Sequence, residues 1–146
     1  MALFTLLTTK GFVHVTGGLN WGSNSKNHTR ILDAYIPIHI KTIRRNLALV
    51  PLKSPVKNQN IINVFWDDGV NMQCRFEGTI TDSKTGNIYP KQISSYPNKD
   101  ILGVYLRQRL NVAGIRPIVM ADLTIYGRTD VDITHLGANN YHFNFL

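Results

Sequence analysis

Strict alternation of apolar and polar residues is the feature that most limits the fold of this chain. In a β-strand, successive side chains point to opposite faces, so an apolar residue at every second position marks a strand with one buried face. In residues 35–41 the isoleucines share one face, and Pro37, His39 and Lys41 share the other. The same pattern recurs in residues 130–134 and 141–145. The alternation predicts a mostly β domain.

Turn residues separate further strand candidates and order them into hairpins. Asp68-Gly69, a pair that readily adopts the positive φ angles of a tight turn, lies between residues 61–66 and 72–76. Residues 136–140 supply turn residues before the last strand and predict a closing hairpin. Two weaker strand candidates complete the set, at residues 12–16 and 47–52.

Only two segments have the spacing of a helix. A polar cap sequence predicts a helix over about residues 101–110, with an apolar stripe toward the core and with Arg107 and Arg109 projecting elsewhere. A shorter helix is predicted over about residues 119–126, where Gly127 is well placed as a left-handed cap. The sequence therefore predicts a mostly β domain with two short helices.

The composition fits one domain, residues 1–146, folded around a hydrophobic core. Of the 146 residues, 43% are hydrophobic and 17% are charged, which is unlike a disordered tail. No apolar run approaches the roughly 18–20 residues that cross a bilayer, and the first residues are too short for a secretory signal. The single cysteine, Cys74, excludes an intramolecular disulfide. We therefore expect a cytoplasmic protein with no membrane partner.

Positive charge is concentrated in the first part of the chain. The net charge is +7. Residues 1–66 contain eight Lys or Arg and one acid, Asp33, whereas residues 67–146 contain eight of each sign. A concentrated basic half suggests a surface for a polyanion, and nucleic acid is the first candidate. The alternative is a soluble protein that is merely basic.

Two polar stretches, residues 17–30 and 82–98, have neither strand nor helix periodicity. Such stretches are usually solvated loops. Their side chains are also those that DNA-binding proteins use, because Asn, Gln, Arg and Lys read base edges, and Ser, Thr and Lys hold phosphates. The residues alone leave both interpretations open.

Five short fragments, in this order and spacing, resemble the C-terminal region of the NgoFVII-type restriction endonucleases. In that family a phospholipase-D-like nuclease domain is followed by a DNA-recognition domain of the plant B3 type. The resemblance extends from about Leu7 to Phe145. The fragments are GLNWG at residues 18–22, AYIPI at 34–38, DDG at 67–69, LGVYLRQRL at 102–110 and YGRTD at 126–130.

The resemblance implies a B3-like, seven-stranded open pseudobarrel with a short helix at each end of the opening. It also implies sequence-specific binding of double-stranded DNA through the major groove, as the target-recognition domain of a restriction endonuclease. Two arms would grip the DNA, an N-terminal arm at residues 20–30 and a C-terminal arm with its root strand at about residues 75–96. Because the nuclease half of the family is missing here, a nuclease domain is expected to be fused, associated or absent.

On this basis, the candidate DNA-binding side chains belong to the two arms and to a basic cluster between them. Arg30 is the strongest candidate, because a guanidinium at the end of an arm can bind guanine or phosphate through two hydrogen bonds. The basic cluster, formed by Lys41, Arg44 and Arg45, suits non-specific phosphate contact. The full set is Asn20, Ser23, Asn24, Ser25, Lys26, Asn27, His28, Arg30, Lys41, Arg44, Arg75, Thr79, Thr81, Lys84, Asn87, Tyr89, Lys91, Gln92, Ser94 and Tyr96.

No catalytic site is visible in the sequence, and we expect neither a cofactor nor a metal. His39-Ile40-Lys41 matches the start of a phospholipase-D-like motif, but Asn46 occupies the position of its aspartate. Asp67 and Asp68 are adjacent, yet turn chemistry explains this pair better than a magnesium site. Two alternatives stay open. One is a small metal-dependent or phospholipase-D-like nuclease in its own right, and the other is a β-sandwich protein-interaction module.

Overall fold

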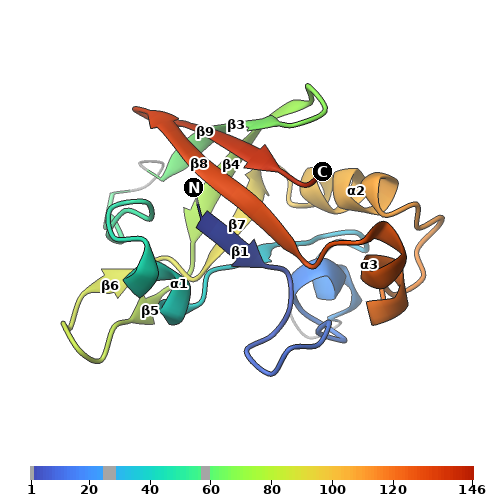
Figure 1. Ribbon diagram of the computed structural model, residues 1–146, viewed down its shortest axis with the longest axis horizontal. Coiled ribbons are helices and arrows are strands. Elements are labelled where there is room, and N and C mark those ends of the chain that lie inside the picture. Colours follow the sequence, from blue (N-terminus) through green and yellow to red (C-terminus); the bar gives the residue numbers. More distant parts are fainter. Residues whose placement is uncertain (1, 25–28, 57–59) are drawn as a thin grey trace.

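A single sheet of seven strands forms the body of the protein (Figure 1). The computed structural model describes residues 2–24, 29–56 and 60–146. The strand order across the sheet is β1-β8-β9-β3-β4-β7-β2. Neighbouring strands are antiparallel except β3 and β9, which run parallel. The strands are β1 (Ala2–Thr5), β2 (Ile36–Pro37), β3 (Ile61–Trp66), β4 (Asn71–Glu77), β7 (Gln92–Tyr96), β8 (Asp130–Gly137) and β9 (Asn140–Asn144).

The sheet curls until its two edge strands meet. β1 and β2 lie beside each other, but no backbone ladder joins them in the described part of the chain. The result is a nearly closed barrel in which β1 and β2 are neighbours but are not hydrogen-bonded as strands. This confirms the predicted mostly β pseudobarrel. One seven-stranded sheet also differs from the two packed sheets of a β-sandwich. A separate hairpin, β5 (Ile80–Thr81) with β6 (Ile88–Tyr89), extends from the barrel between β4 and β7 (Figure 1).

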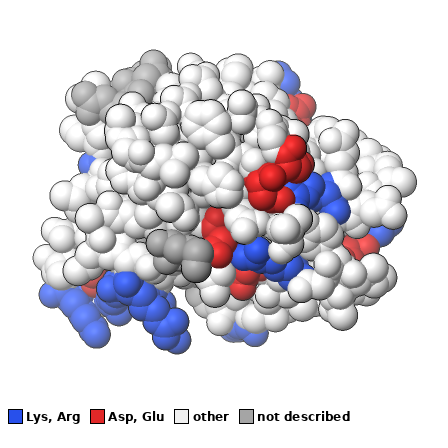
Figure 2. Space-filling model, turned by 45° about the horizontal axis from the view of Figure 1, so that its top comes forward, with Lys and Arg blue, Asp and Glu red and all other residues white. Residues whose placement is uncertain are grey.

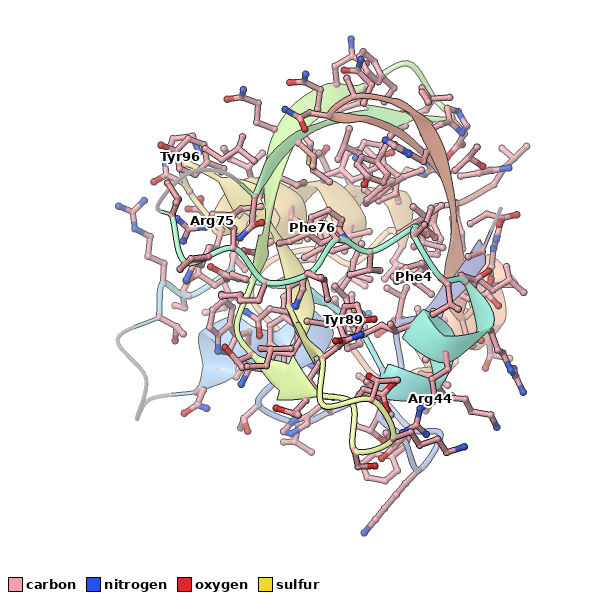
Figure 3. The ribbon with its side chains drawn as sticks, turned by 90° about the vertical axis from the view of Figure 1, so that its left-hand side faces the viewer. Phe4, Arg44, Arg75, Phe76, Tyr89 and Tyr96 are labelled. Carbon is pink, nitrogen blue, oxygen red and sulfur yellow. The ribbon has the colours of Figure 1, made fainter. Side chains whose placement is uncertain are left out.

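The barrel interior is filled by the alternate residues that the sequence pattern assigned to one face. Phe4 of β1 and Phe76 of β4 point into it (Figure 3), and both are almost fully buried. On β3, Ile62, Val64 and Trp66 are buried, and the residues between them are more exposed. Burying one such side chain contributes about 1.5–3 kcal/mol. The interior is therefore a packed core rather than a channel.

In the described part of the chain, three α-helices and one 3₁₀ helix accompany the sheet. They are η1 (Gly18–Ser23), α1 (Ile40–Arg45), α2 (Asp100–Arg109) and α3 (Met120–Tyr126). α2 and α3 confirm the two predicted helices. Leu102 and Leu106 of α2 are buried against the core, and Gly127 ends α3 with a φ of +96°, as expected for a left-handed cap. Both predicted hairpins, β3–β4 and β8–β9, are also present.

The strand predicted over residues 35–41 is wrong in its second half. Ile36 and Pro37 pair with β7, and Ile38 donates one more backbone hydrogen bond to Lys91. The chain then turns into α1, because the backbone N–H groups of Thr42 and Ile43 donate to the carbonyl oxygen of His39. Ile40 and Ile43 are three residues apart, and this spacing fits a helix face as well as a strand.

The two weaker strand candidates are also wrong. Residues 12–16 and 47–52 are irregular. Phe12 and Val15 are exposed, as are Leu47 and Leu52. Ala48 has a φ of +73°, which no extended strand allows. These apolar residues form no strand face, so their local pattern was misleading.

Candidate nucleic-acid interface

A groove lies between the two predicted arms, and we call it the inter-arm groove. Its cavity volume is about 370 Å³. The N-terminal arm and the segment around β7 both contribute to its walls, so residues far apart in the sequence meet here. The residues that line it include Trp21, Asn24, Glu77, Lys91, Gln92 and Lys99.

Close backbone packing shapes the root of the N-terminal arm. The N–H of Gly22 donates to the carbonyl of Asp33, and a Cβ on Gly22 would lie 2.3 Å from the carbonyl oxygen of Ile31. Gly103 of α2 is equally restricted, since a Cβ there would lie 1.7 Å from the carbonyl oxygen of Leu32. Both glycines are required because the returning chain passes directly against them. They explain the second glycine of the GLNWG fragment and the glycine of LGVYLRQRL.

Trp21 anchors the same root. Its ring packs edge-on against Tyr35, with ring centroids 5.1 Å apart. The ammonium of Lys99 lies over the Trp21 ring, 4.6 Å from its centroid. An ammonium over an indole face is attracted by the ring quadrupole. Lys99 therefore links the N-terminal arm to the start of α2.

Glu77 is the centre of a hydrogen-bonded cluster at the end of β4. The β4–β7 register pairs Arg75 with Ser94 and Glu77 with Gln92, which places all four side chains on one face of the sheet. Glu77 Oε1 accepts hydrogen bonds from Ser94 Oγ at 2.6 Å and Gln92 Nε2 at 3.0 Å. Its Oε2 accepts one from Arg75 at 2.9 Å. Lys99 Nζ is 3.5 Å from Oε1.

The surroundings of Glu77 favour its charged form. Burial alone would raise the pKa of this carboxyl, but the hydrogen bonds from Ser94, Arg75 and Gln92 and the charge of Lys99 lower it below its ordinary value. Glu77 therefore remains a carboxylate at neutral pH. On the outer side of the cluster, the Arg75 guanidinium lies 5.8 Å from the Tyr96 ring centroid, and Figure 3 shows these two side chains together.

Sequence reasoning missed both Glu77 and Lys99. The available signal was that Glu77 is the only glutamate of the chain and lies inside the predicted C-terminal arm. Its partners could not be named without the strand register, because Gln92 and Ser94 are 15 and 17 residues away.

Asp82 organises the tip of the C-terminal arm. Its Oδ1 accepts the backbone N–H of Lys84 at 2.9 Å, and its carbonyl accepts that of Gly86 at 2.7 Å. Arg44 of α1 donates to the same Oδ1 at 2.7 Å. The hydrogen bonds from Arg44 and Lys84 lower the pKa of Asp82. α1 thus fastens the β5–β6 hairpin to the barrel, and Figure 3 places Arg44 beside the hairpin.

The remaining predicted site residues differ in exposure. Asn20 is buried, and its carboxamide bonds the backbone of His14 and Ile118. The other buried members are Tyr89, Gln92 and Ser94. Asn24, Arg44, Arg75 and Tyr96 are half-buried. The exposed members are Ser23, Arg30, Lys41, Thr79, Thr81, Lys84, Asn87 and Lys91. Ser25, Lys26, Asn27 and His28 lie outside the described residues.

A second hollow, with a volume of about 290 Å³, lies where α1 meets β1. Lys41 and Arg45 of α1 line it, together with four threonines, Thr5, Thr8, Thr9 and Thr42. Asp130 also lines it, and its carboxylate is paired with Arg128 at 2.9 Å. Lys41 and Arg45 are exposed, and neither forms a salt bridge with a described residue. Figure 2 shows Lys and Arg side chains gathered at the lower left, the end of the molecule where Figure 1 draws α1 and the β5–β6 hairpin.

The residues considered for catalysis have other contacts. His39 Nε2 donates to the carbonyl oxygen of Leu7 at 2.9 Å. Asp67 is bound by Arg109, and Asp68 accepts the backbone N–H of Val70 in the β3–β4 turn. Among the described residues, no group of three or more His, Cys, Asp or Glu side chains is arranged to hold a metal ion.

The helices of the described residues were compared with the length and apolar character of a membrane span. Across residues 2–24, 29–56 and 60–146, none is long and apolar enough to cross a bilayer.

The nearly closed seven-stranded sheet, with a hairpin and an irregular segment beside one groove, defines a pseudobarrel of the B3 type. A family comparison agrees, because the model of the NgoFVII C-terminal B3-like DNA-binding domain matches residues 2–137, nearly the whole chain. The chain belongs to this family and is a B3-like DNA-binding domain of the restriction-enzyme type. Comparison with curated proteins gave no match.

Proposed function

We propose that this domain recognises a specific sequence in double-stranded DNA and supplies target recognition for a restriction endonuclease. The observation that carries the proposal is the convergence of both arms on the inter-arm groove, with Trp21 and Asn24 from one arm and Lys91 and Gln92 from the other. The DNA major groove is about 12 Å wide and admits a two-stranded β-ribbon. The β5–β6 hairpin has this shape, which supports entry into the major groove.

Base reading is assigned to the exposed polar side chains of the arms. Arg30 has 68% of its side chain exposed, and its ion-pair partner among the described residues, Asp100, is 4.0 Å away. Its guanidinium is thus available for a bidentate contact with guanine. Lys84, Asn87 and Lys91 are exposed on the C-terminal arm and have the donors and acceptors that base edges and phosphates require.

The buried members of the predicted set receive a supporting role in this proposal. Asn20 ties η1 to the segment before α3 through its two bonds to Ile118. Gln92 and Ser94 bind Glu77. A side chain whose donors and acceptors are already bonded inside the domain loses those bonds if it turns to DNA. These residues are therefore proposed to shape the arms.

Phosphate contact is assigned to Lys41 and to Arg45 rather than to Arg44. Arg44 is bound to Asp82, whereas Lys41 and Arg45 are exposed beside the threonine hydroxyl groups of the second hollow. Lysine and arginine that neutralise phosphates release counterions, and this gives affinity that falls steeply with salt. The cleavage activity is proposed to come from a nuclease domain, fused or associated, that acts on the same cytoplasmic DNA.

Selection from random duplex oligonucleotides tests the proposal directly. The bound pool is sequenced, and the enriched and a scrambled duplex are then titrated at two salt concentrations. We expect one short motif, bound at least about 1,000-fold more tightly than the scrambled duplex. Uniform binding with the same steep salt dependence on both duplexes would refute sequence recognition.

Plasmid incubated with the domain, with and without magnesium, tests the nuclease alternative, which predicts cutting that an Asp68→Ala variant loses.

A further inference from the structure

We propose that Glu77 is a specificity-determining residue because it keeps Arg75 and Lys99 away from DNA phosphates. By holding Lys99 in the inter-arm groove and Arg75 in the adjoining hollow on the other side of Glu77, it lowers non-specific binding and leaves affinity dependent on the base contacts of the arms. This inference rests on the proposed function and names a residue that regulates it.

The Glu77 carboxylate is largely buried and surrounded by hydrogen-bond donors. Only 13% of its side chain is exposed, and its two carboxylate oxygens face four donors from three elements of the fold. Two of these donors, Gln92 and Ser94, are neutral and would be satisfied by a neutral acceptor. The two others, Arg75 and Lys99, are cations at 2.9 and 3.5 Å, and a carboxylate is what holds them by charge.

The position of the cluster carries the second step. Glu77, Gln92 and Lys99 line the inter-arm groove, the surface assigned to DNA. A phosphate that approached this groove would meet a carboxylate whose pKa is lowered and which therefore stays charged. Because its negative charge offsets one of the two adjacent positive charges, Arg75 and Lys99 attract a phosphate less than two unpaired cations would. Contacts to base edges, which carry no net charge, do not depend on this attraction, so reducing it shifts affinity from the backbone toward the bases.

The stacking of Lys99 carries the third step. With its ammonium above the Trp21 ring and beside Glu77, Lys99 makes two favourable contacts inside the domain. It must give up both to reach a phosphate. Arg75 is held in the same way between Glu77 and the Tyr96 ring. Two of the domain's sixteen Lys and Arg residues are thus withdrawn from non-specific binding.

The test compares Glu77→Gln with wild type on the enriched and the scrambled duplex. Glutamine keeps the size of the side chain and one carbonyl acceptor, but it releases the two cations. Each cation that gains a phosphate contact steepens the salt dependence by about 0.9. We therefore expect scrambled-duplex affinity to rise by about tenfold, the slope to steepen by about 1–2, and the ratio of specific to scrambled affinity to fall.

Asp68→Asn is the matched control. It raises the net charge by the same amount, and Asp68 lies at the β3–β4 turn, where asparagine can also accept the N–H of Val70. Its Oδ2 is 3.4 Å from Arg109, but Arg109 keeps its two hydrogen bonds to Asp67, so no cation is released. We expect its affinities to change little. If Asp68→Asn raises scrambled-duplex binding as much as Glu77→Gln does, net charge explains the effect and the proposal is wrong. A purely structural role for Glu77 predicts weaker binding to both duplexes with an unchanged ratio.

Lys99→Gln provides a test that leaves Glu77 in place. In wild type we expect it to change the salt slope on scrambled DNA by much less than 1, whereas in the Glu77→Gln background it should remove about 0.9. A full loss of about 0.9 in wild type would show that Lys99 already contacts phosphate and would overturn the proposal. These outcomes differ from failure of the proposed function, in which wild type itself shows no preference between duplexes.

Discussion

Arg109, at the end of α2, binds Asp67, at the end of β3, through two hydrogen bonds of 3.1 and 2.9 Å. The same guanidinium donates to the carbonyl oxygen of Phe145 at 2.8 Å, and Asp67 accepts the backbone N–H of Phe145 at 2.7 Å. The side chains of Arg109 and Asp67 are 12% and 8% exposed. This pair therefore fastens the C-terminal end of the chain to the β3–β4 turn and to α2.

Replacing Arg109 with methionine is expected to destabilise the domain. The substitution leaves the Asp67 carboxylate without its cation in a mostly buried position, and breaking such a pair costs about 3 kcal/mol. For a domain of this size, the melting temperature should fall by about 10 °C. Thermal unfolding followed by circular dichroism measures it. Arg30→Gln, at an exposed arginine, is the control and should melt like wild type. Equal melting of all three proteins would contradict the structural role of the pair.

Stability should also fall in acid through Asp67. Burial opposes the charge of Asp67, but the hydrogen bonds from Arg109 and from the Phe145 backbone lower its pKa below the ordinary value of 3.8. A carboxyl whose pKa is lower in the folded state stabilises the fold above its unfolded pKa. This contribution is lost as pH falls below about 4. Chemical unfolding between pH 7 and pH 3 should show a smaller loss in Asp67→Asn than in wild type, and identical pH profiles would exclude this role.

The sequence predicted those parts of the fold that depend on neighbouring residues. The β3–β4 turn follows from Asp68-Gly69, and the end of α3 follows from Gly127, because each needs only a local backbone conformation. α1 could not be recognised, since Ile36, Ile38 and Ile40 alternate as in a strand. The last backbone hydrogen bond of this strand segment joins Ile38 to Lys91, which is 53 residues later in the sequence. Local alternation carries no information about such a distant partner.

The candidate site stays a prediction, and the sequence indicates only those of its features that depend on local composition. Polar composition indicated the two arms, but burial and pairing decide which side chains face outward. Arg44 suited phosphate contact by composition, and the fold joins it to Asp82 instead. Arg107 and Arg109 were expected to project from the apolar stripe of α2, yet Arg107 is buried and donates to the carbonyl oxygen of Arg116. Partners distant in the sequence determine the environment of each.

Replacing Gly103 with alanine should destabilise the protein, although alanine is the better helix former. In an exposed helix this change gains up to about 1 kcal/mol. Here the new Cβ would lie 1.7 Å from the carbonyl oxygen of Leu32, so α2 or the root of the N-terminal arm must shift, at a cost of about 1–3 kcal/mol. Gln108→Ala, on the exposed side of the same helix, is the control. A higher melting temperature for Gly103→Ala would contradict the close contact.

Releasing the C-terminal arm through Arg44→Gln should reduce specific binding. Without Arg44, the Asp82 turn loses its connection to α1, and the β5–β6 hairpin must be ordered when DNA binds. We expect about a tenfold loss on the enriched duplex and little change on the scrambled one, because mainly base contacts need an ordered arm. Faster hydrogen exchange at the amides of Lys84 and Gly86 should accompany it. Unchanged exchange would exclude Arg44 as the anchor of the hairpin.

Lys41→Gln and Arg45→Gln should weaken binding to every duplex alike. Both cations are exposed beside the second hollow and have no salt-bridge partner among the described residues. A phosphate contact is independent of sequence, so each substitution should reduce the salt slope by about 1 and leave the recognised motif unchanged. Arg30→Gln should instead relax the preference at one position of the motif, at a cost of about 1–3 kcal/mol. If all three variants lose the same affinity and keep the same motif, phosphates and bases are not read by separate surfaces.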